Sequence, residues 1–246
     1  MPGVAVVTGG GAGIGRAAAV ALARAGWRVV VAGRREAPLN LACRECPERM
    51  RAIVADVVSE ESVRALFAQT LASFGRVDLL FNNAGVVPPP AEVADVSLGD
   101  WSAVLAVNVT GSFLCAREAF RVMARQSPRG GRIINNGSLS AYLPRPRTLA
   151  YTVSKHAISG LTRALSLEGR SHDIACGQID IGNAATQLTE PLAAGALQAN
   201  GSLVPEPRID LEHVASSVVH MASLPLDANV LFMTVMATKM PFVGRG

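Results

Sequence analysis

Short runs of apolar, often β-branched residues alternate with longer helical stretches along the chain. Each run has the length of one strand. The runs cover residues 4–8, 28–32, 51–55, 77–82, 131–137, 173–180 and 229–235. The helical stretches include residues 12–25, 59–74, 98–126 and 149–168. This alternation is typical of a parallel sheet with helices on both faces, so we expect an α/β doubly wound parallel sheet of about seven strands.

One domain over residues 1–246 accounts for this pattern, because no linker, repeat or low-complexity segment interrupts it. A chain of 246 residues that is 50% hydrophobic and 17% charged is not disordered, collagen-like or a small disulfide scaffold. Its net charge of +4 comes from 23 basic residues scattered among 19 acidic ones. We therefore expect no nucleic-acid partner.

The four cysteines do not form a disulfide framework. Cys43 and Cys46 form one CxxC motif, which leaves a zinc ion two ligands short, so we expect no metal site. No apolar run reaches the roughly 18 residues of a membrane span, and an apolar strand rather than a signal peptide begins at Val4. We expect a cytoplasmic location and no membrane partner.

A glycine-rich turn, Thr8 to Gly15, lies between the first predicted strand and the first predicted helix. At such a position, backbone N–H groups and the helix dipole can bind a pyrophosphate. The spacing differs from GxGxxG but meets the same need for a tight turn and close backbone approach. A simple turn without a ligand is the alternative. The candidate ligand-binding residues are Gly9, Gly11, Gly13, Ile14 and Gly15.

Polar motifs follow several of the later strands. They are Asp56-Val57, Asn82-Asn83-Ala84-Gly85, Asn108, Ser138 and Tyr151-x-x-x-Lys155. In this order, with the serine thirteen residues before the tyrosine, they resemble the short-chain dehydrogenase/reductase family in its single-domain form, from Val4 to about Leu224. The resemblance implies a Rossmann-type fold and an oxidoreductase that moves a hydride between a nicotinamide coenzyme and a carbonyl or secondary alcohol.

Tyr151 and Lys155 are four residues apart on a predicted helix, so they share one face. The ammonium group can lie near the phenol and favour the phenolate form. Ser138, at a strand end, can donate a hydrogen bond to a substrate oxygen and stabilise charge there. A tyrosine–lysine pair with this spacing is otherwise a common surface contact.

The resemblance assigns a role to each motif residue. Tyr151 is the proton donor or acceptor, Lys155 also binds the nicotinamide ribose, Ser138 orients the substrate and Asn108 completes a proton relay. The same resemblance implies that Tyr151 and Lys155 also contact the coenzyme. It further implies contacts from residues that flank the adenine or line the adenosine ribose, which are Asp56, Val57, Asn83, Ala84 and Gly85.

The end of the second predicted strand indicates the coenzyme. Gly33 stands where NAD-selective members carry an aspartate, and Arg34 and Arg35 follow it. A guanidinium group can bind a 2′-phosphate through two hydrogen bonds. We therefore expect NADP(H) rather than NAD(H), with Arg34 as the first contact. The alternative is that both arginines are simply solvated.

Two segments depart from the family pattern. Ile181 replaces a proline after the sixth strand, while the glycine and threonine of that turn remain. The expected nicotinamide-side contacts are Ile181, Gly182, Ala184 and Thr186. The C-terminal tail is apolar and methionine-rich, which favours a subunit interface. We expect a homodimer or homotetramer.

Two loops and several leucine side chains indicate where a substrate binds. Residues 187–208, and the proline-rich residues 87–93, are predicted to wall a substrate pocket, although both can be ordinary surface loops. Leu188, Leu192 and Leu197, with the residues after Ser138, predict an apolar pocket for a small carbonyl or alcohol. Arg145 and Arg147 are either contacts for an acidic substrate or solvated charges.

Two other functions compete with this one. A non-catalytic dinucleotide-binding regulatory or scaffold protein has the same fold, but the intact Asn108, Ser138, Tyr151 and Lys155 speak against it. An epimerase or dehydratase of the longer related branch is disfavoured because those chains need a C-terminal substrate domain.

Overall fold

The computed structural model describes residues 2–243; residues 1 and 244–246, and the side chains of residues 191 and 192, lie outside the description. Seven strands form one parallel sheet in the order β3-β2-β1-β4-β5-β6-β9. The strands are β1 (Val4–Thr8), β2 (Arg28–Gly33), β3 (Met50–Val54), β4 (Leu79–Asn82), β5 (Gly131–Asn136), β6 (Ile174–Ile181) and β9 (Phe232–Val235). This confirms the predicted doubly wound, Rossmann-type sheet.

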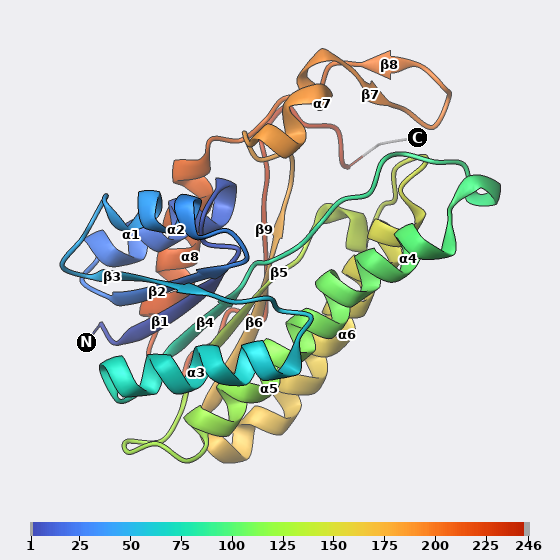
Figure 1. Cartoon of the computed structure of the whole chain (residues 1–246). Helices are drawn as coiled ribbons and strands as arrows, with labels where there is room; N and C mark the ends of the chain where they lie inside the picture. Colours follow the sequence, from blue (N-terminus) through green and yellow to red (C-terminus); the bar gives the residue numbers. More distant parts are fainter. Residues whose placement is uncertain (1, 244–246) are drawn as a thin grey trace.

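Helices connect these strands and cover both faces of the sheet (Figure 1). They are α1 (Gly13–Arg24), α2 (Glu36–Cys43), α3 (Glu60–Phe74), α4 (Leu98–Leu105), α5 (Ser112–Met123), α6 (Leu149–Gly169), α7 (Glu190–Ala194) and α8 (Leu211–Ser223). Helix α3 begins as its sequence suggests, because the Ser59 side chain accepts a hydrogen bond from the Ser62 N–H at 3.2 Å. Gly75, with a φ of 76°, ends it.

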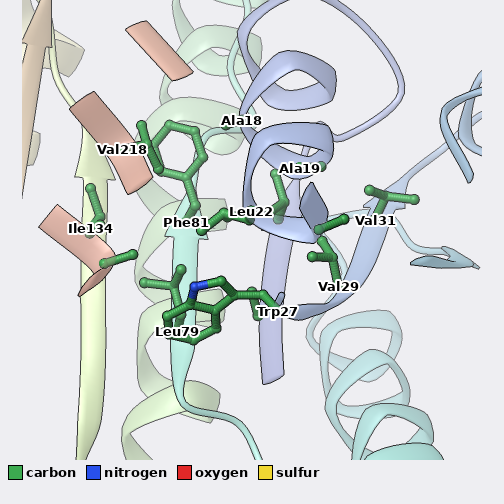
Figure 2. Close-up of a cluster of buried hydrophobic side chains, with 14 of the residues drawn as sticks. Ala18, Ala19, Leu22, Trp27, Val29, Val31, Leu79, Phe81, Ile134 and Val218 are labelled. Atoms are coloured by element: carbon green, nitrogen blue, oxygen red, sulfur yellow. The ribbon is translucent and has the colours of Figure 1, made fainter. Parts of the chain in front are cut away.

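Two apolar clusters hold the layers together. Figure 2 shows the first, in which α1 and α8 pack on one face of the sheet through side chains such as Leu22, Val218 and Phe81. The second lies on the opposite face, where α3 and α5 contact β-strand residues such as Leu80. Alternate residues of the central strands therefore face different layers, and both faces are dry.

Helices α4 and α5 are joined by a π-helical turn, Ala106–Gly111, where we expected one regular helix over residues 98–126. The whole stretch, Leu98–Met123, has the length and composition of a membrane span, with a mean hydropathy of 1.2 in its most apolar window. Half of that window is buried inside the protein. Packing of α5 on β4 and β5, and of α4 on α6, accounts for the buried half.

Residues 187–208 lie beyond the carboxyl ends of the strands (Figure 1). They contain helix α7 and a short antiparallel pair, β7 (Ala196–Leu197) with β8 (Leu203–Val204). The C-terminal tail returns to the same edge of the molecule (Figure 1). This edge is where a doubly wound sheet places its ligand site.

Candidate active site

The glycine-rich turn joins β1 to α1 at the carboxyl edge of the sheet. Gly9 and Gly13 have φ values of 64° and 50°, which favour glycine. A Cβ atom on Gly15 would overlap the Gly9 carbonyl oxygen, so the turn can close only without a side chain there. The helix start therefore lies directly beside the turn, as pyrophosphate binding requires.

A cleft of about 210 Å³ extends from this turn across the ends of β2, β3 and β4. Of the predicted coenzyme contacts, its lining includes Gly9, Gly11, Arg34, Arg35, Asp56, Val57, Ala84 and Gly85. The lining residues that were not predicted as coenzyme contacts are Ala12, Gly33, Pro38, Leu39, Ala55, Val86 and Val107. The cleft has glycines at one end, arginines at the β2 end and apolar walls, which fits a dinucleotide.

Arg34 and Arg35 follow β2 with exposed side chains. Neither guanidinium group forms an ion pair with a carboxylate anywhere in residues 2–243. Both are therefore available to an anion in the cleft.

Three other residues expected near the coenzyme, Asn83, Ile14 and Thr186, are absent from the lining of this cleft and lie in or beside the glycine-rich turn. The Asn83 side chain donates to the Thr8 carbonyl oxygen at 2.9 Å and accepts from the Asn136 side chain at 2.9 Å, so it joins the ends of β1, β4 and β5. Ile14 packs against the core beneath α1. A Cβ on Gly13 would come within 3.2 Å of the Thr186 methyl group, which places Thr186 over the glycine-rich turn.

Tyr151 and Lys155 lie one turn apart near the start of α6. The Lys155 ammonium nitrogen is 5.5 Å from the centre of the Tyr151 ring. Lys155 is only 7% exposed, and its ammonium group donates to the Asn136 carbonyl oxygen at 2.8 Å. The Tyr151 hydroxyl makes no hydrogen bond within the described chain, so it is open to a substrate. The sequence spacing thus corresponds to an observed pair.

Asn108 lies buried in the π-helical turn between α4 and α5. Its side chain forms two hydrogen bonds with the Val86 backbone, accepting at 2.8 Å and donating at 2.9 Å. It also donates to the Ser154 hydroxyl at 3.1 Å, and Ser154 donates to the Tyr151 carbonyl oxygen at 2.7 Å. Asn108 therefore connects the segment after β4 to the helix turn that carries Tyr151. Such π-turns often occur at functional sites.

Ser138 follows β5 and begins a short 3₁₀ turn. Its side-chain oxygen accepts from the Ser140 N–H at 3.1 Å, which leaves its hydroxyl proton available. Its own backbone N–H donates to Asp180 at 3.0 Å.

Strand β6 continues through Ile181, which pairs with Val235 of β9, because no proline ends it there. Gly182 lies under the tail, since a Cβ on it would come within 2.8 Å of the Met236 Cβ and the Met240 sulfur. Ala184 is buried and bridges to Ile209. Of the four expected nicotinamide-side contacts, Thr186 lies nearest to the glycine-rich turn.

A group of buried polar residues lies behind Ser138 and was not predicted from the sequence. Asp180 and Gln178 in β6 are both fully buried, and the Tyr142 hydroxyl donates to Asp180 at 2.7 Å. Burial holds the pKa of the Asp180 carboxyl above its ordinary value, although hydrogen bonds from Tyr142, Gln178 and Ser138 and the charge of Lys155 act to lower it. An acid inside an apolar parallel strand was the available signal.

Arg145 is not a solvated charge, which was one of the two interpretations of the sequence. Its guanidinium group forms a buried ion pair with Glu206, with one contact of 2.9 Å, and also donates to Asn183 at 3.1 Å. Arg147 pairs with Glu92 at 2.7 Å on the surface. Both arginines suggested for an acidic substrate are therefore occupied by carboxylates.

The C-terminal tail lies against the site. Met240 is 6% exposed, and its sulfur accepts from the Asn183 N–H at 3.4 Å. The Phe242 ring meets the Tyr142 ring edge-on, with centres 6.4 Å apart. Met240 and Phe242 therefore pack against residues that follow β6 and Ser138 within the chain, and the expected assembly surface stays a prediction.

Comparisons with known proteins agree with this geometry. A family model described as short chain dehydrogenase matches residues 3–196. A 3β-hydroxysteroid dehydrogenase of Mediterraneibacter gnavus is 36% identical over 194 residues, which cover 78% of this chain and 69% of that protein. Sulfoacetaldehyde reductase 2 of Chromohalobacter salexigens is 30% identical over 242 residues, covering 97% and 96% of the two chains.

A solved structure shows the same fold. A short-chain type dehydrogenase/reductase from Mycobacterium marinum superposes with a TM-score of 0.85 at 28% identity, covering 95% of this chain and 93% of that one. With this fold, the ordered motifs and the family match, the chain belongs to the short-chain dehydrogenase/reductase family and is an oxidoreductase of the alcohol and carbonyl class.

Proposed function

We propose that the protein is an NADP(H)-dependent oxidoreductase in which Tyr151 transfers the proton to or from a carbonyl or secondary alcohol. One observation carries this proposal. The buried Lys155 ammonium group lies 5.5 Å from the Tyr151 ring, at the end of the sheet that holds the glycine-lined cleft. The Tyr151 hydroxyl makes no hydrogen bond within the described residues, so the phenol can serve as a general acid and base toward a substrate oxygen.

Each proposed catalytic residue has its own role in the reaction. When bound, the nicotinamide coenzyme donates or accepts the hydride. Ser138 donates a hydrogen bond to the substrate oxygen, and Tyr151 gives that oxygen a proton during reduction or removes it during oxidation. Lys155 holds positive charge beside the phenol, and Asn108 holds the first turn of α6 through Ser154.

The coenzyme would be held by the glycine-rich turn, by Asp56 and Val57 at the adenine, and by Asn83, Ala84 and Gly85 near the ribose. Lys155, Ile181, Gly182, Ala184 and Thr186 complete the nicotinamide side. The preference for NADP(H) over NAD(H) is supported by Arg34 and Arg35, which line the cleft without a carboxylate partner in the described residues.

Absorbance of the reduced nicotinamide tests the reaction, with NADPH and NADH against a broad panel that includes cyclohexanone, benzaldehyde and camphorquinone. We expect turnover with NADPH, and a Tyr151→Phe variant that binds NADPH but is slower by about 10²- to 10⁴-fold, the usual contribution of a general acid. A wild type that binds coenzyme and turns over nothing in the panel would favour the non-catalytic dinucleotide-binding protein.

The coenzyme preference has its own test. Arg34→Ala should weaken NADPH binding by about tenfold or more and leave NADH binding within twofold, because only the 2′-phosphate loses a charged hydrogen bond. Arg24→Ala is a control, since Arg24 is an exposed arginine whose side chain pairs with Glu45 at the far end of α1. An unchanged NADPH/NADH ratio in Arg34→Ala would refute the contact.

We propose a small, uncharged carbonyl or alcohol as the substrate, since Arg145 and Arg147 are already paired. Residues 187–208 form the substrate loop in this proposal. We also propose a cytoplasmic homodimer or homotetramer. Exposed apolar side chains such as Phe113 support an interface, and light scattering measures the assembly state.

A further inference from the structure

Asp180 is a fully buried acid whose carboxylate has three donors. The oxygen Oδ1 accepts from the Ser138 N–H at 3.0 Å and from the Gln178 side chain at 2.7 Å. The oxygen Oδ2 accepts from the Tyr142 hydroxyl at 2.7 Å. Burying a carboxylate is costly unless donors surround it, and this one joins the catalytic serine to a tyrosine of the same turn.

The backbone next to Ser138 is shaped to admit this carboxylate. A Cβ on Gly137 would overlap Asp180 Oδ1 and lie 2.6 Å from the Gln178 amide nitrogen. A residue with a side chain at position 137 would therefore displace the acid from beneath Ser138. Gly137 and Asp180 fit together as a pair.

Tyr142, which donates to the second carboxylate oxygen of Asp180, lies at the entrance of the site. It is 45% exposed, follows the turn that begins at Ser138, and meets Phe242 of the tail. Its ring can contact a substrate bound at Ser138, while its hydroxyl is held from below by Asp180. The other charged groups that act on Asp180 and Tyr142 are Lys155 and Arg163, both on α6.

We propose that Asp180 is a positioning residue, which holds the Ser138 backbone with one carboxylate oxygen and the Tyr142 ring against the substrate entrance with the other. Tyr142 is then a specificity-determining contact. This inference rests on the proposed function, because that function assigns Ser138 to the substrate oxygen.

The contact can be measured without turnover, because Tyr142 and Tyr151 are the only two tyrosines of the chain. Burial and the Asp180 carboxylate raise the pKa of Tyr142 to about 12. Phenolate absorbance from pH 7 to 11 should show Tyr142 protonated in the wild type. Asp180→Asn should lower its pKa and give more phenolate at pH 11. Tyr142→Phe supplies the spectrum to subtract, and circular dichroism checks that each variant is folded.

The kinetic test uses NADPH and the carbonyl compound of the panel that the wild type reduces fastest. Asp180→Asn should lower kcat by about tenfold, the effect of one misplaced hydrogen bond, and leave the Kd of NADPH within twofold. Tyr142→Phe keeps the ring but frees it, so we expect mainly a higher KM. Asp173→Asn is the matched control. This exposed aspartate directly precedes the first residue of β6, at the end of the strand opposite to Asp180, and pairs with Arg129.

The outcomes separate the two proposals. Unchanged phenolate absorbance in Asp180→Asn overturns the contact whatever the activity. A changed titration with kcat and KM equal to those of Asp173→Asn overturns the positioning role. A wild type without turnover refutes the proposed function, and the positioning role with it, while the titration still reports the contact.

Discussion

Glycines near the site are needed for two different physical reasons. Gly9 and Gly13 adopt positive φ, so a side chain there would strain the backbone of the glycine-rich turn. Gly15 and Gly137 have no such φ, but their Cβ positions are occupied by the Gly9 carbonyl and the Asp180 carboxylate. A substitution at Gly9 or Gly13 would strain the backbone, and a substitution at Gly15 or Gly137 would cause a steric overlap.

Gly137→Ala should therefore destabilise the protein by about 1–3 kcal/mol, the usual cost of overpacking. In an Asp180→Ala background the same change should cost much less, because the overlapping oxygen is gone. Urea denaturation of the four proteins of this double-mutant cycle measures the coupling. Additive effects of the two substitutions would show that Gly137 and Asp180 do not share this space.

Helix α6 is the element that carries Tyr151 and Lys155, the pair proposed for catalysis. Its 21 residues carry Tyr151 and Lys155 in the first two turns, and its buried side packs on β6. Gly160 lies on the exposed side in the middle of this helix, and a Cβ there would have no atom within 4 Å. Glycine in such a position costs conformational entropy without serving a contact.

Gly160→Ala should stabilise the protein by about 0.5–1 kcal/mol, because alanine restricts the unfolded chain and favours helix. Thermal or urea denaturation measures the gain, and activity serves as the control because position 160 is remote from the coenzyme cleft. A loss of stability would mean that the helix surface at this position is not open.

Across the whole molecule, the Arg145–Glu206 pair joins three segments that are distant in sequence. Glu206 belongs to the substrate loop, Arg145 follows the turn after Ser138, and Asn183 follows β6. Burial alone would raise the pKa of the Glu206 carboxyl, but hydrogen bonds from Arg145, Gln198 and Asn183 hold that pKa at about 2. The loop is thus held over the carboxyl edge by a buried charge pair.

A lowered pKa makes this stabilisation depend on pH. The stabilisation from Glu206 is fully present when the pH is above 4.5, the ordinary pKa of the carboxyl, and is lost as the pH falls from 4.5 toward about 2. Glu206→Gln should cost about 3 kcal/mol at pH 7, because Arg145 loses its partner. The difference in unfolding free energy between the two proteins should shrink at pH 3. A difference that is constant with pH would refute this role for Glu206.

The motifs and the strand alternation were sufficient to predict the sheet, the family and the proximity of Tyr151 and Lys155. Each of these follows from local chemistry: β-branched runs form strands, a glycine-rich turn precedes a helix, and Tyr151 and Lys155 share a face because they are four residues apart. Residues that act through short sequence distances can be recognised without coordinates.

Only the tertiary structure showed that Asp180 supports Ser138, that Arg145 pairs with Glu206, that the tail packs on Tyr142, and that a π-turn holds Asn108. The first three contacts join residues 42, 61 and 100 positions apart, whereas the π-turn is a local backbone geometry. Their existence depends on which strand ends and loops meet at one edge of the sheet, and helical periodicity does not distinguish an α-turn from a π-turn. Packing decides such contacts, and packing is a property of the folded chain.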